Sequence, residues 1–468
     1  MDELVQRCDA YLAEHEAEHL GALQDLLRIP SVSALPQHQA DVQRAAEWVA
    51  ARLRTLGVPD VRLLETERNP IVFGHWPVDP SLPTALVYGH YDVQPPDPLD
   101  LWETPPFEPT LRDGRLYARG ASDDKGNLFA ALCGIEALVR IIGQPPINLK
   151  FFFEGEEEIG SPSMAAAIRQ YRELLACDVV ISADGGMYGH DQPSLTLSSK
   201  GICACQVDLR TAATDMHSGQ YGAVIANAVQ TLVQLAATFH TPDGRVAIAG
   251  FYDKVRELSP EERAEIAAVP FDPAQFLANV GAKTFWGEPG YTPLERAWAR
   301  PTLDLNGFWG GFQGEGIKTV TPCEAHLKIT CRLVPDQDPE EILDLIERHV
   351  QAHCPPWAEV RVTRFPGSAR PFAIRRDHPA LAAARVVLRE LYGKEPLMTR
   401  VGGTIPVAEV FQRELGADML FFAWGMPDNR VHAPNESYRI EDFRTMARAY
   451  VRLLLRLADS MARAGTTQ

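Results

Sequence analysis

The chain has 468 residues, more than a single hydrophobic core usually serves, so two domains are expected. Hydrophobic residues make up 46% of the chain and charged residues 23%, which is ordinary for a soluble globular protein. The net charge of −17, from 45 basic and 62 acidic residues, gives no electrostatic reason to expect nucleic acid or an anionic membrane as a partner.

The beginning of the chain is helical in pattern and carries no sign of export. Residues 3–28 and 41–56 have the periodicity of amphipathic helices, and the second ends at Gly57. No basic segment followed by an apolar one is present, and no run of about 18 apolar residues occurs anywhere. The eight cysteines are scattered, and Cys203 and Cys205 are expected to be buried thiols rather than metal ligands. These features indicate a cytoplasmic protein.

Short apolar runs alternate with helical patterns in the first part of the chain. Strands are predicted in 84–93, 145–158 and 177–186, and helices in 126–142 and 162–176. This alternation predicts an α/β fold, in which helices cover both faces of a mostly parallel sheet. Ligands of such sheets bind at the carboxyl ends of the strands, and here each predicted strand ends in acidic residues or histidine.

The pattern changes after residue 200 and returns near residue 379. The middle region has the alternation of antiparallel strands at 201–212 and 323–334, helices near 221–239 and 338–353, and a loop-rich stretch at about 241–320. The last region has helices at 379–392 and 440–462 and an apolar run at 419–425. We therefore predict a discontinuous α/β domain, residues 1–200 and 379–468, interrupted by an inserted α+β domain, residues 201–378.

The polar residues at the ends of the predicted strands are of the types that hold two metal ions. A pair of divalent ions about 3.5–4 Å apart needs a bridging carboxylate, further histidine or carboxylate ligands, and an acid/base group beside them. Adjacent glutamates suit this division, because one can bind metal while the other transfers protons. An aspartate two residues after a histidine can orient its ring. The residues concerned are His90, Asp92, Asp123, Glu157, Glu158, Asp184 and His432.

Each of these motifs has an ordinary interpretation when it is taken alone. A histidine and an aspartate two apart are usually a surface or capping pair, a run of glutamates is usually a solvated edge, and a histidine in a proline-rich loop usually has no function. Their joint occurrence at the ends of apolar strands within one α/β frame favours the metal site.

Eight sequence motifs follow one another along the chain: YGHYDVQP, GASDDKG, FEGEEEIGS, SADGG, TDMHSGQYGA, CRLVP, RVGGTIPV and VHAPNE. In this order they resemble the metallopeptidase family of carnosinase and cytosolic nonspecific dipeptidase. More distant relatives are aminoacylase, acetylornithine deacetylase and succinyl-diaminopimelate desuccinylase. The resemblance extends from about residue 20 to about residue 460.

The resemblance implies a zinc-peptidase-like catalytic domain and a role for each candidate residue in it. His90 and Asp184 would bind one divalent metal, zinc or manganese, and Glu158 and His432 the other, with Asp123 bridging them. Glu157 would be the general base and acid, and Asp92 would orient His90. Asp124 and Thr404 stand where asparagine and serine are common in the family, and both substitutions keep a polar side chain.

The inserted domain is implied to be a lid that also forms a homodimer. His217 would reach the partner subunit's active site and stabilise the oxyanion of the tetrahedral intermediate, although it could instead only cap the following helix. Arg332, with the backbone around Gly402, Gly403 and Thr404, would bind the substrate's free carboxylate, although Arg332 could instead be part of a structural salt bridge.

The implied function is hydrolysis of a dipeptide with a free C-terminal carboxylate. The long 241–320 stretch resembles the dipeptidase branch of the family. The main alternative is an N-acyl amino acid deacylase or desuccinylase that uses the same metals. A non-catalytic binding protein on the same fold is a remote alternative, because Glu157 is retained.

Overall fold

The computed structural model describes residues 1–464, and the chain forms two compact units. Unit 1 comprises Met1–Thr196, Ile374–Met398 and the chain from Val410 onward, and unit 2 comprises Leu197–Ala373 and Thr399–Glu409. Unit 1 is an α/β unit and unit 2 is an inserted α+β unit, as the sequence predicts. The catalytic and lid roles assigned to the predicted domains stay predictions.

The segment Thr399–Glu409 belongs to unit 2, although the predicted boundaries assign it to the catalytic domain. Hydrogen bonds explain this difference. The backbone N–H of Lys200 donates to the carbonyl oxygens of Val401 (3.2 Å) and Gly403 (2.9 Å). The guanidinium of Arg332 donates to the hydroxyl of Thr404 (2.8 Å). The segment is therefore tied to unit 2 by contacts that are distant in sequence.

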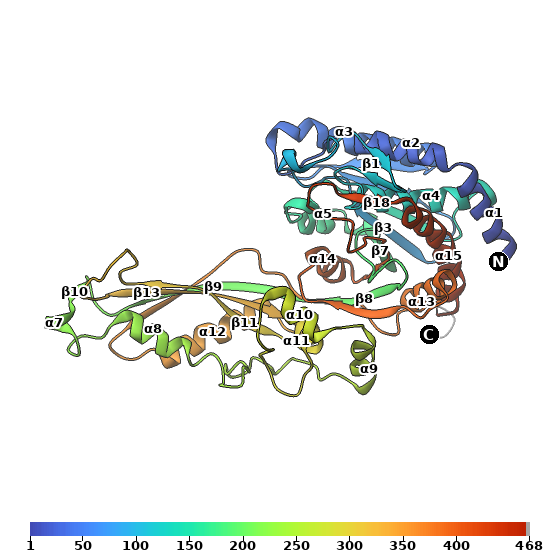
Figure 1. Cartoon of the computed structure of the whole chain (residues 1–468). Coiled ribbons are helices and arrows are strands. Elements are labelled where there is room, and N and C mark those ends of the chain that lie inside the picture. The colour runs from blue at the N-terminus through green and yellow to red at the C-terminus, as the bar shows by residue number, and fades with distance from the viewer. Residues whose placement is uncertain (465–468) are drawn as a thin grey trace. The chain divides into compact units, whose positions relative to one another are not determined.

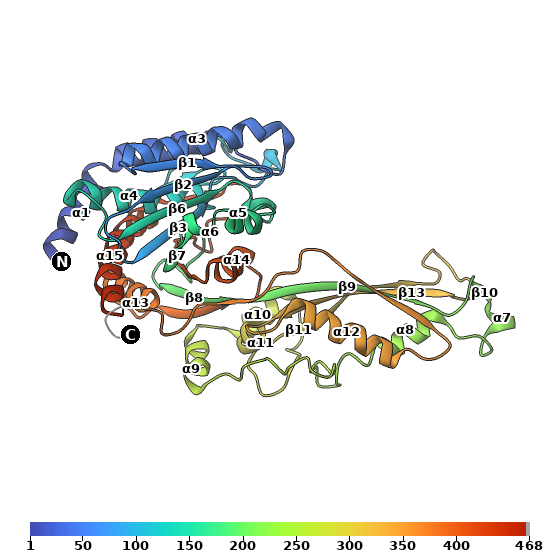
Figure 2. The same cartoon turned by 180° about the vertical axis from the view of Figure 1, so that it is seen from behind.

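Unit 1 is built around a six-stranded mixed sheet in the order β1-β2-β6-β3-β7-β17. Figure 2 shows β1, β2, β6, β3 and β7 side by side in this order. The pairs of β3 with β6, β3 with β7, and β7 with β17 are parallel, whereas β1 and β2 form an antiparallel edge. The strands are β1 (Asp60–Leu64), β2 (Ile71–Trp76), β3 (Thr84–His90), β6 (Asn148–Glu154), β7 (Val179–Ser182) and β17 (Asp418–Phe421).

Helices cover both faces of this sheet, and three consecutive phenylalanines in β6 show why. Successive side chains of a strand point to opposite faces. Phe152 packs its ring against Phe411 of α14 (Pro406–Leu415), with the ring centroids 5.3 Å apart. Phe151 lies on the other face with Leu53 of α3 (Gln39–Leu56), where Gly74 leaves room for both. A run that is apolar on both sides is typical of a strand buried between two helical layers.

The remaining helices of unit 1 follow the predicted pattern closely. The predicted helix 3–28 is divided at His15 into α1 and α2, and α3 ends at Gly57, whose φ is +101°. The helix α4 packs tightly on α15, because a Cβ added at Gly134 would lie 2.3 Å from the carbonyl oxygen of Ala447. The bounds are α1 (Asp2–Glu14), α2 (Glu16–Leu27), α4 (Lys125–Ile142), α5 (Met164–Gln170), α6 (Arg172–Leu175), α13 (Pro379–Tyr392) and α15 (Ile440–Ala464).

Short strands form two further sheets, of which the second includes residues of both units. A three-stranded sheet has the order β18-β5-β4, and another has the order β15-β8-β16. Their bounds are β4 (Thr110–Arg112), β5 (Arg115–Tyr117), β8 (Ser194–Ser199), β15 (Phe372–Ala373), β16 (Leu397–Val401) and β18 (Ser437–Arg439).

Unit 2 is a four-stranded antiparallel sheet in the order β11-β13-β9-β14, with α8 and α12 packed along it (Figure 1). Every second side chain of β9 is buried, which is the alternation of a sheet with one covered face. Cys203 and Cys205 are buried thiols in this core, as expected. The elements are β9 (Gly201–Arg210), β11 (Thr302–Gly310), β13 (Glu324–Leu333), β14 (Glu359–Arg364), α8 (Ala228–Ala236), α12 (Pro339–His353) and, near its end, β10 (Met216–His217), α7 (Ser218–Tyr221) and β12 (Val320–Thr321).

The stretch 241–320 is more regular than the sequence suggested. It contains β11 and three short helices, α9 (Pro260–Ala268), α10 (Pro273–Val280) and α11 (Pro293–Ala299). Each helix starts with proline directly after a side chain that caps its N-terminus, namely Ser259, Asp272 and Thr292. Proline is well tolerated at the first helical position, so these prolines mark helix starts and not loops.

In the part of the chain that the structure describes, no helix combines the length and the hydropathy needed to cross a membrane.

Candidate metal centre

Three strand ends bring the candidate residues of unit 1 to one edge of the sheet. The strand β3 lies between its parallel neighbours β6 and β7 and ends at His90. The strand β6 is followed by a short 3-10 helix, η3 (Glu157–Ile159), and Asp184 follows β7. Because the carboxyl ends of parallel strands meet at the same edge, His90, the residues of η3 and Asp184 lie at one edge of the sheet.

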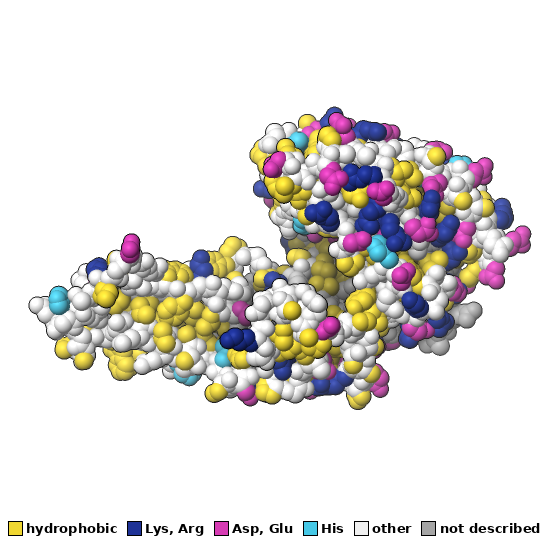
Figure 3. All heavy atoms as spheres, in the orientation of Figure 1, with side chains coloured by type: hydrophobic (Ala, Val, Ile, Leu, Met, Phe, Trp, Pro, Cys, Tyr) yellow, Lys and Arg dark blue, Asp and Glu magenta, His cyan; other side chains and the backbone are white. Residues whose placement is uncertain are grey.

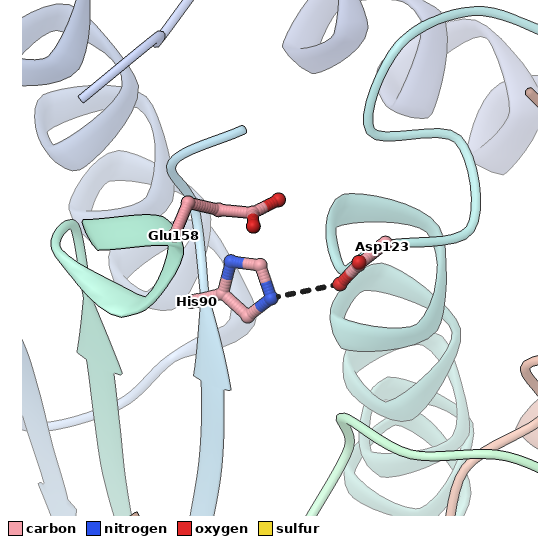
Figure 4. Close-up of side chains that lie close together, drawn as sticks. All are labelled: His90, Asp123 and Glu158. Carbon is pink, nitrogen blue, oxygen red and sulfur yellow. Dashed lines mark hydrogen bonds and ion pairs between the residues drawn. The ribbon is translucent and has the colours of Figure 1, made fainter. Parts of the chain in front are cut away.

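His90, Asp123, Glu158 and His432 form a contiguous cluster. The Nε2 atom of His90 lies 3.0 Å from Oδ1 of Asp123, an interaction drawn in Figure 4. The Nε2 atom of His432 lies 2.9 Å from Oδ2 of Asp123 and 3.1 Å from Oε2 of Glu158. Asp123 thus lies between the two imidazoles, with one carboxylate oxygen facing each.

Asp92 connects His90 to the segment that carries both glutamates. Its carboxylate accepts the backbone N–H groups of Glu157 (3.2 Å) and Glu158 (3.1 Å), and one oxygen lies 3.4 Å from Nδ1 of His90. Its side chain is fully buried. Gln94 donates to the Glu158 carboxylate from its side chain (2.9 Å) and from its backbone (3.1 Å). These contacts fix the orientation of both the histidine ring and the glutamate.

A residue that the sequence did not single out, Glu436, holds the Asp123 loop. Its buried carboxylate accepts four hydrogen bonds: from the backbone N–H groups of Gly120 (2.9 Å), Ser122 (2.9 Å) and Asp123 (3.0 Å), and from the guanidinium of Arg119 (2.7 Å). Glu436 is the last residue of the VHAPNE motif, but nothing in the motif shows that its side chain turns inward.

The loop that carries His432 has an unusual backbone. Arg430, His432 and Asn435 all have positive φ, at 57°, 60° and 62°. Such conformations cost free energy for residues other than glycine, so surrounding contacts have to maintain them. Asn435 supplies some of these contacts, because its side chain accepts the N–H of Glu103 (2.8 Å) and donates to the carbonyl oxygen of Leu101 (2.9 Å).

The electrostatics of the cluster are those of carboxylates crowded in a buried space. Burial raises the pKa of Glu157 to about 9, and the negative charges of Asp184 and Asp123 act in the same direction. Burial and the charge of Asp123 raise the pKa of Asp184 to about 6. Hydrogen bonds with Asp123 and Glu158 raise the pKa of His432 to about 10. Burial acts to raise the pKa of Asp123, but its hydrogen bonds with the two histidines hold it well below its ordinary value.

The donor set fits divalent cations. Ligand atoms of His90, Asp123 and Glu158 all lie within 4.8 Å of one another. Buried carboxylates that repel one another are stabilised by a shared cation, and imidazole with carboxylate suits zinc, manganese or cobalt. The residues present therefore fit a metal centre. The assignment of each residue to a particular ion stays a prediction.

The candidate residues of unit 2 lie on β13, in the loop 402–404 and at the start of α7. Gly402, Gly403 and Thr404 lie in a loop against Lys200 and Arg332, and Arg332 donates to Thr404. His217 lies at the exposed start of α7, where its Nδ1 accepts the backbone N–H of Gly219 (3.0 Å). The capping role considered for His217 from the sequence is therefore present.

A cluster of histidines and carboxylates at the carboxyl edge of an α/β sheet is the arrangement of a metal-dependent hydrolase. Residues 86–456 match the model of Peptidase family M20/M25/M40, and the chain belongs to this family. It is therefore a peptidase of a metal-dependent family.

Individual relatives match along nearly the whole chain. Cys-Gly metallodipeptidase dug1 of Schizosaccharomyces pombe is 31% identical, over 91% of this chain and 92% of the relative. Beta-Ala-His dipeptidase of Rattus norvegicus is 26% identical, over 91% of this chain and 90% of the relative. Among solved structures, the M20 metallo-carboxypeptidase Sso-CP2 from Sulfolobus solfataricus has a TM-score of 0.77 and 31% identity, covering 94% of this chain and 99% of the other.

The Glu436 network generates a prediction about stability. Glu436→Gln places an amide N–H₂ against hydrogen-bond donors in either orientation, and it leaves Arg119 without its buried countercharge. We expect this substitution to lower the free energy of unfolding of the metal-free protein by about 2–4 kcal/mol. Glu103→Gln is the matched control, because Glu103 pairs with Arg112 at the surface. It should cost less than about 1 kcal/mol.

Denaturant unfolding of both metal-free variants measures the difference. Equal midpoints for Glu436→Gln and Glu103→Gln would show that the buried network contributes no more than a surface ion pair.

Proposed function

We propose that this peptidase hydrolyses the amide bond of dipeptides that have a free C-terminal carboxylate. The proposal rests on one observation: the chain has two sites of opposite charge. Unit 1 has the cluster of carboxylates and histidines, and unit 2 has Arg332 beside Thr404 with no acidic partner among the described residues. The relatives named as dipeptidases support this substrate class.

Two divalent metal ions per chain, zinc or manganese, would be held by unit 1. His90 and Asp184 would bind one ion, Glu158 and His432 the other, and Asp123 would bridge them. Its two carboxylate oxygens, each facing one histidine, suit a bridge. When bound, the ions would act as Lewis acids on the substrate carbonyl and would lower the pKa of water. Asp92 would keep the Nε2 atom of His90 directed at its ion through the contact at Nδ1.

Glu157 would accept the proton of the attacking water and transfer it to the leaving amine. Its burial and the surrounding carboxylates raise its pKa, so it holds and releases a proton more readily near neutral pH than an exposed glutamate does. Bound cations would act against this rise, which brings the group nearer the range that a general base and acid require.

The substrate's carboxylate would bind to Arg332, Thr404 and the backbone at Gly402 and Gly403. A guanidinium binds a carboxylate through two parallel hydrogen bonds, and Arg332 uses one nitrogen for Thr404. In the part of unit 2 that the structure describes, Arg332 forms no ion pair with a carboxylate. Its charge is therefore available to an acidic ligand.

His217 would complete the active site of the partner subunit in a homodimer. Because Nδ1 of His217 accepts a hydrogen bond, the neutral ring carries its proton on Nε2, where it is free to donate to a developing oxyanion. The face of unit 2 seen in Figure 3 carries a broad hydrophobic area. Large apolar residues near α7 and α8 are exposed, which is typical of an interaction surface: Tyr221, Val224, Ile225 and Val233.

Other substrates with a free carboxylate are the main alternative. N-acyl amino acids would use the same metal centre, and their carboxylate would bind to Arg332 in the same way. The likeness to a metallo-carboxypeptidase makes longer peptides a further class to test. A panel of dipeptides, tripeptides and N-acetyl and N-succinyl amino acids separates these classes. A non-catalytic binding protein would hydrolyse none of them. The eight free thiols suit the reducing cytoplasm, which we propose as the location.

The two adjacent glutamates generate a prediction about separate roles. Glu157→Gln should reduce kcat by several orders of magnitude and leave two metals per chain, because it removes proton transfer and no ligand. Glu158→Gln should lower the metal content toward one per chain, because a ligand is lost. Elemental analysis and turnover of both variants decide this point. If both variants lose metal equally, the assigned roles are wrong.

The carboxylate site generates a second prediction. Replacing the dipeptide's carboxylate by an amide should lower kcat/KM at least about tenfold, because a charge-assisted hydrogen bond contributes roughly 1.5–3 kcal/mol. Arg332→Ala should largely remove this difference between the two substrates. Arg361→Ala, which removes an exposed arginine of the same sheet, is the control and should keep it. An unchanged preference in Arg332→Ala would place the carboxylate elsewhere.

The shared active site generates a third prediction. His217→Ala and Glu157→Gln chains are each expected to be inactive alone, but a mixed dimer would contain one site with both groups intact. Equal mixing makes about half of the dimers mixed, so roughly a quarter of the wild-type activity should return after subunit exchange. Mass spectrometry confirms the exchange. Complete exchange without recovered activity would show that His217 does not serve a partner's site.

A further inference from the structure

Unit 2 has a second positive charge beside Arg332, that of Lys200. In the pairing of β13 with β9, Arg332 is opposite Ile202, and Lys200 precedes Ile202 by two residues. Residues in this diagonal relation lie on the same face of an antiparallel pair, within reach of long side chains. Lys200 and Arg332 therefore belong to one cationic group on the sheet.

Lys200 is buried, with 2% of its surface exposed. Its ammonium donates to the carbonyl oxygen of Arg296 (3.0 Å), in α11. Its backbone N–H donates to Val401 and Gly403. The loop that contains Gly403 also contacts α11, because a Cβ added at Gly402 would lie 2.9 Å from the carbonyl oxygen of Ala297. Lys200 is thus enclosed by the elements that surround the proposed carboxylate site.

The neighbouring acidic groups are engaged elsewhere. Glu288 forms two hydrogen bonds with the guanidinium of Arg300, both 2.8 Å long. Asp304 on β11 is exposed and accepts the hydroxyl of Thr302 (2.8 Å). In unit 2, as far as it is described, no carboxylate forms an ion pair with Lys200. A buried ammonium with a single neutral partner is costly, and an acidic ligand offsets that cost.

We propose that Lys200 is the second cation of the carboxylate-binding site and, together with Arg332, determines the preference for substrates with a free C-terminal carboxylate. This inference rests on the proposed function, because it concerns the same substrate group. Arg332 supplies directed hydrogen bonds. Lys200 supplies a fixed positive charge behind the loop Gly402–Thr404, where low solvent exposure strengthens its attraction for an anion.

The proposal implies a limit at alkaline pH. Burial and the charge of Arg332 lower the pKa of Lys200 from about 10.5 to about 8. Asp304 acts in the opposite direction, and Arg300 lowers the pKa further. Lys200 therefore loses its charge as the pH rises through about 8, and the preference for the free carboxylate should weaken above this pH. A bound carboxylate shifts the loss to higher pH, because it favours the charged form.

Binding can be measured without turnover in the Glu157→Gln background. Calorimetry at pH 7 compares alanyl-alanine with alanyl-alanine amide on the metal-loaded protein. Lys200→Met should weaken binding of the free dipeptide about tenfold and change binding of the amide less than twofold. Lys328→Met is the matched control, since Lys328 is an exposed residue of β13 on the same face as Arg332, and its removal should change neither affinity.

A second variant keeps the test decisive if Lys200→Met folds poorly. Lys200→Arg retains its charge at all relevant pH values. For this variant, the ratio of the affinity for the free dipeptide to the affinity for the amide should stay constant between pH 7 and pH 9.5. For the protein that retains Lys200, the same ratio should fall severalfold. A ratio that is independent of pH in both proteins would overturn the proposal.

The outcomes also separate this inference from the proposed function. If the wild-type enzyme hydrolyses dipeptides but Lys200→Met weakens the free and amidated dipeptides equally, Lys200 has only a packing role. If the wild-type enzyme hydrolyses no dipeptide of the panel, the proposed function itself fails.

Discussion

Crowded negative charge in a buried space is the constraint on which unit 1 depends. Asp123, Glu157, Glu158 and Asp184 approach the same edge of the sheet, with two histidines between them. Burial, together with the repulsion between these like charges, raises the pKa values of Glu157 and Asp184. A fold that holds these groups in place must supply fixed positions and partial positive charge. A bound divalent cation would then neutralise the negative charge that remains.

The fixed positions come from carboxylates that would not bind metal themselves. Asp92 and Glu436 are fully buried, and between them they accept five backbone N–H groups from the two segments that carry Glu158 and Asp123. A carboxylate that accepts several backbone hydrogen bonds orders a loop firmly, because every unpaired N–H would be costly. The sheet fixes where each strand ends, and these two side chains fix how the chain continues beyond that end. The geometry of the cluster therefore has an outer frame of acidic residues.

The sequence predicted the parts of this arrangement that rest on periodicity and residue type. Strand ends carrying His90, Glu158 and Asp184 were recognisable because an apolar run followed by polar residues has one common explanation in an α/β fold. The part that Glu436 plays in the outer frame was not recognisable from periodicity and residue type. Glu436 stands in a polar loop, where an acidic side chain usually faces water, and only the folded chain turns it toward Gly120 and Ser122. The helices starting at Pro260, Pro273 and Pro293 were missed for a related reason, since proline marks both loops and helix starts.

The cationic group of unit 2 would not distinguish a dipeptide from an N-acyl amino acid. Both classes of substrate end in a carboxylate, and Lys200 with Arg332 would bind either. The two substrate classes differ at the other end, where a dipeptide has a protonated amine and an N-acyl amino acid has an uncharged acyl chain. An amine near the cluster of unit 1 gains from any carboxylate oxygen not engaged by a cation, whereas an acyl chain gains only from an apolar surface. Which class is hydrolysed would therefore depend on the negative charge that remains on the carboxylates of unit 1 once cations are bound.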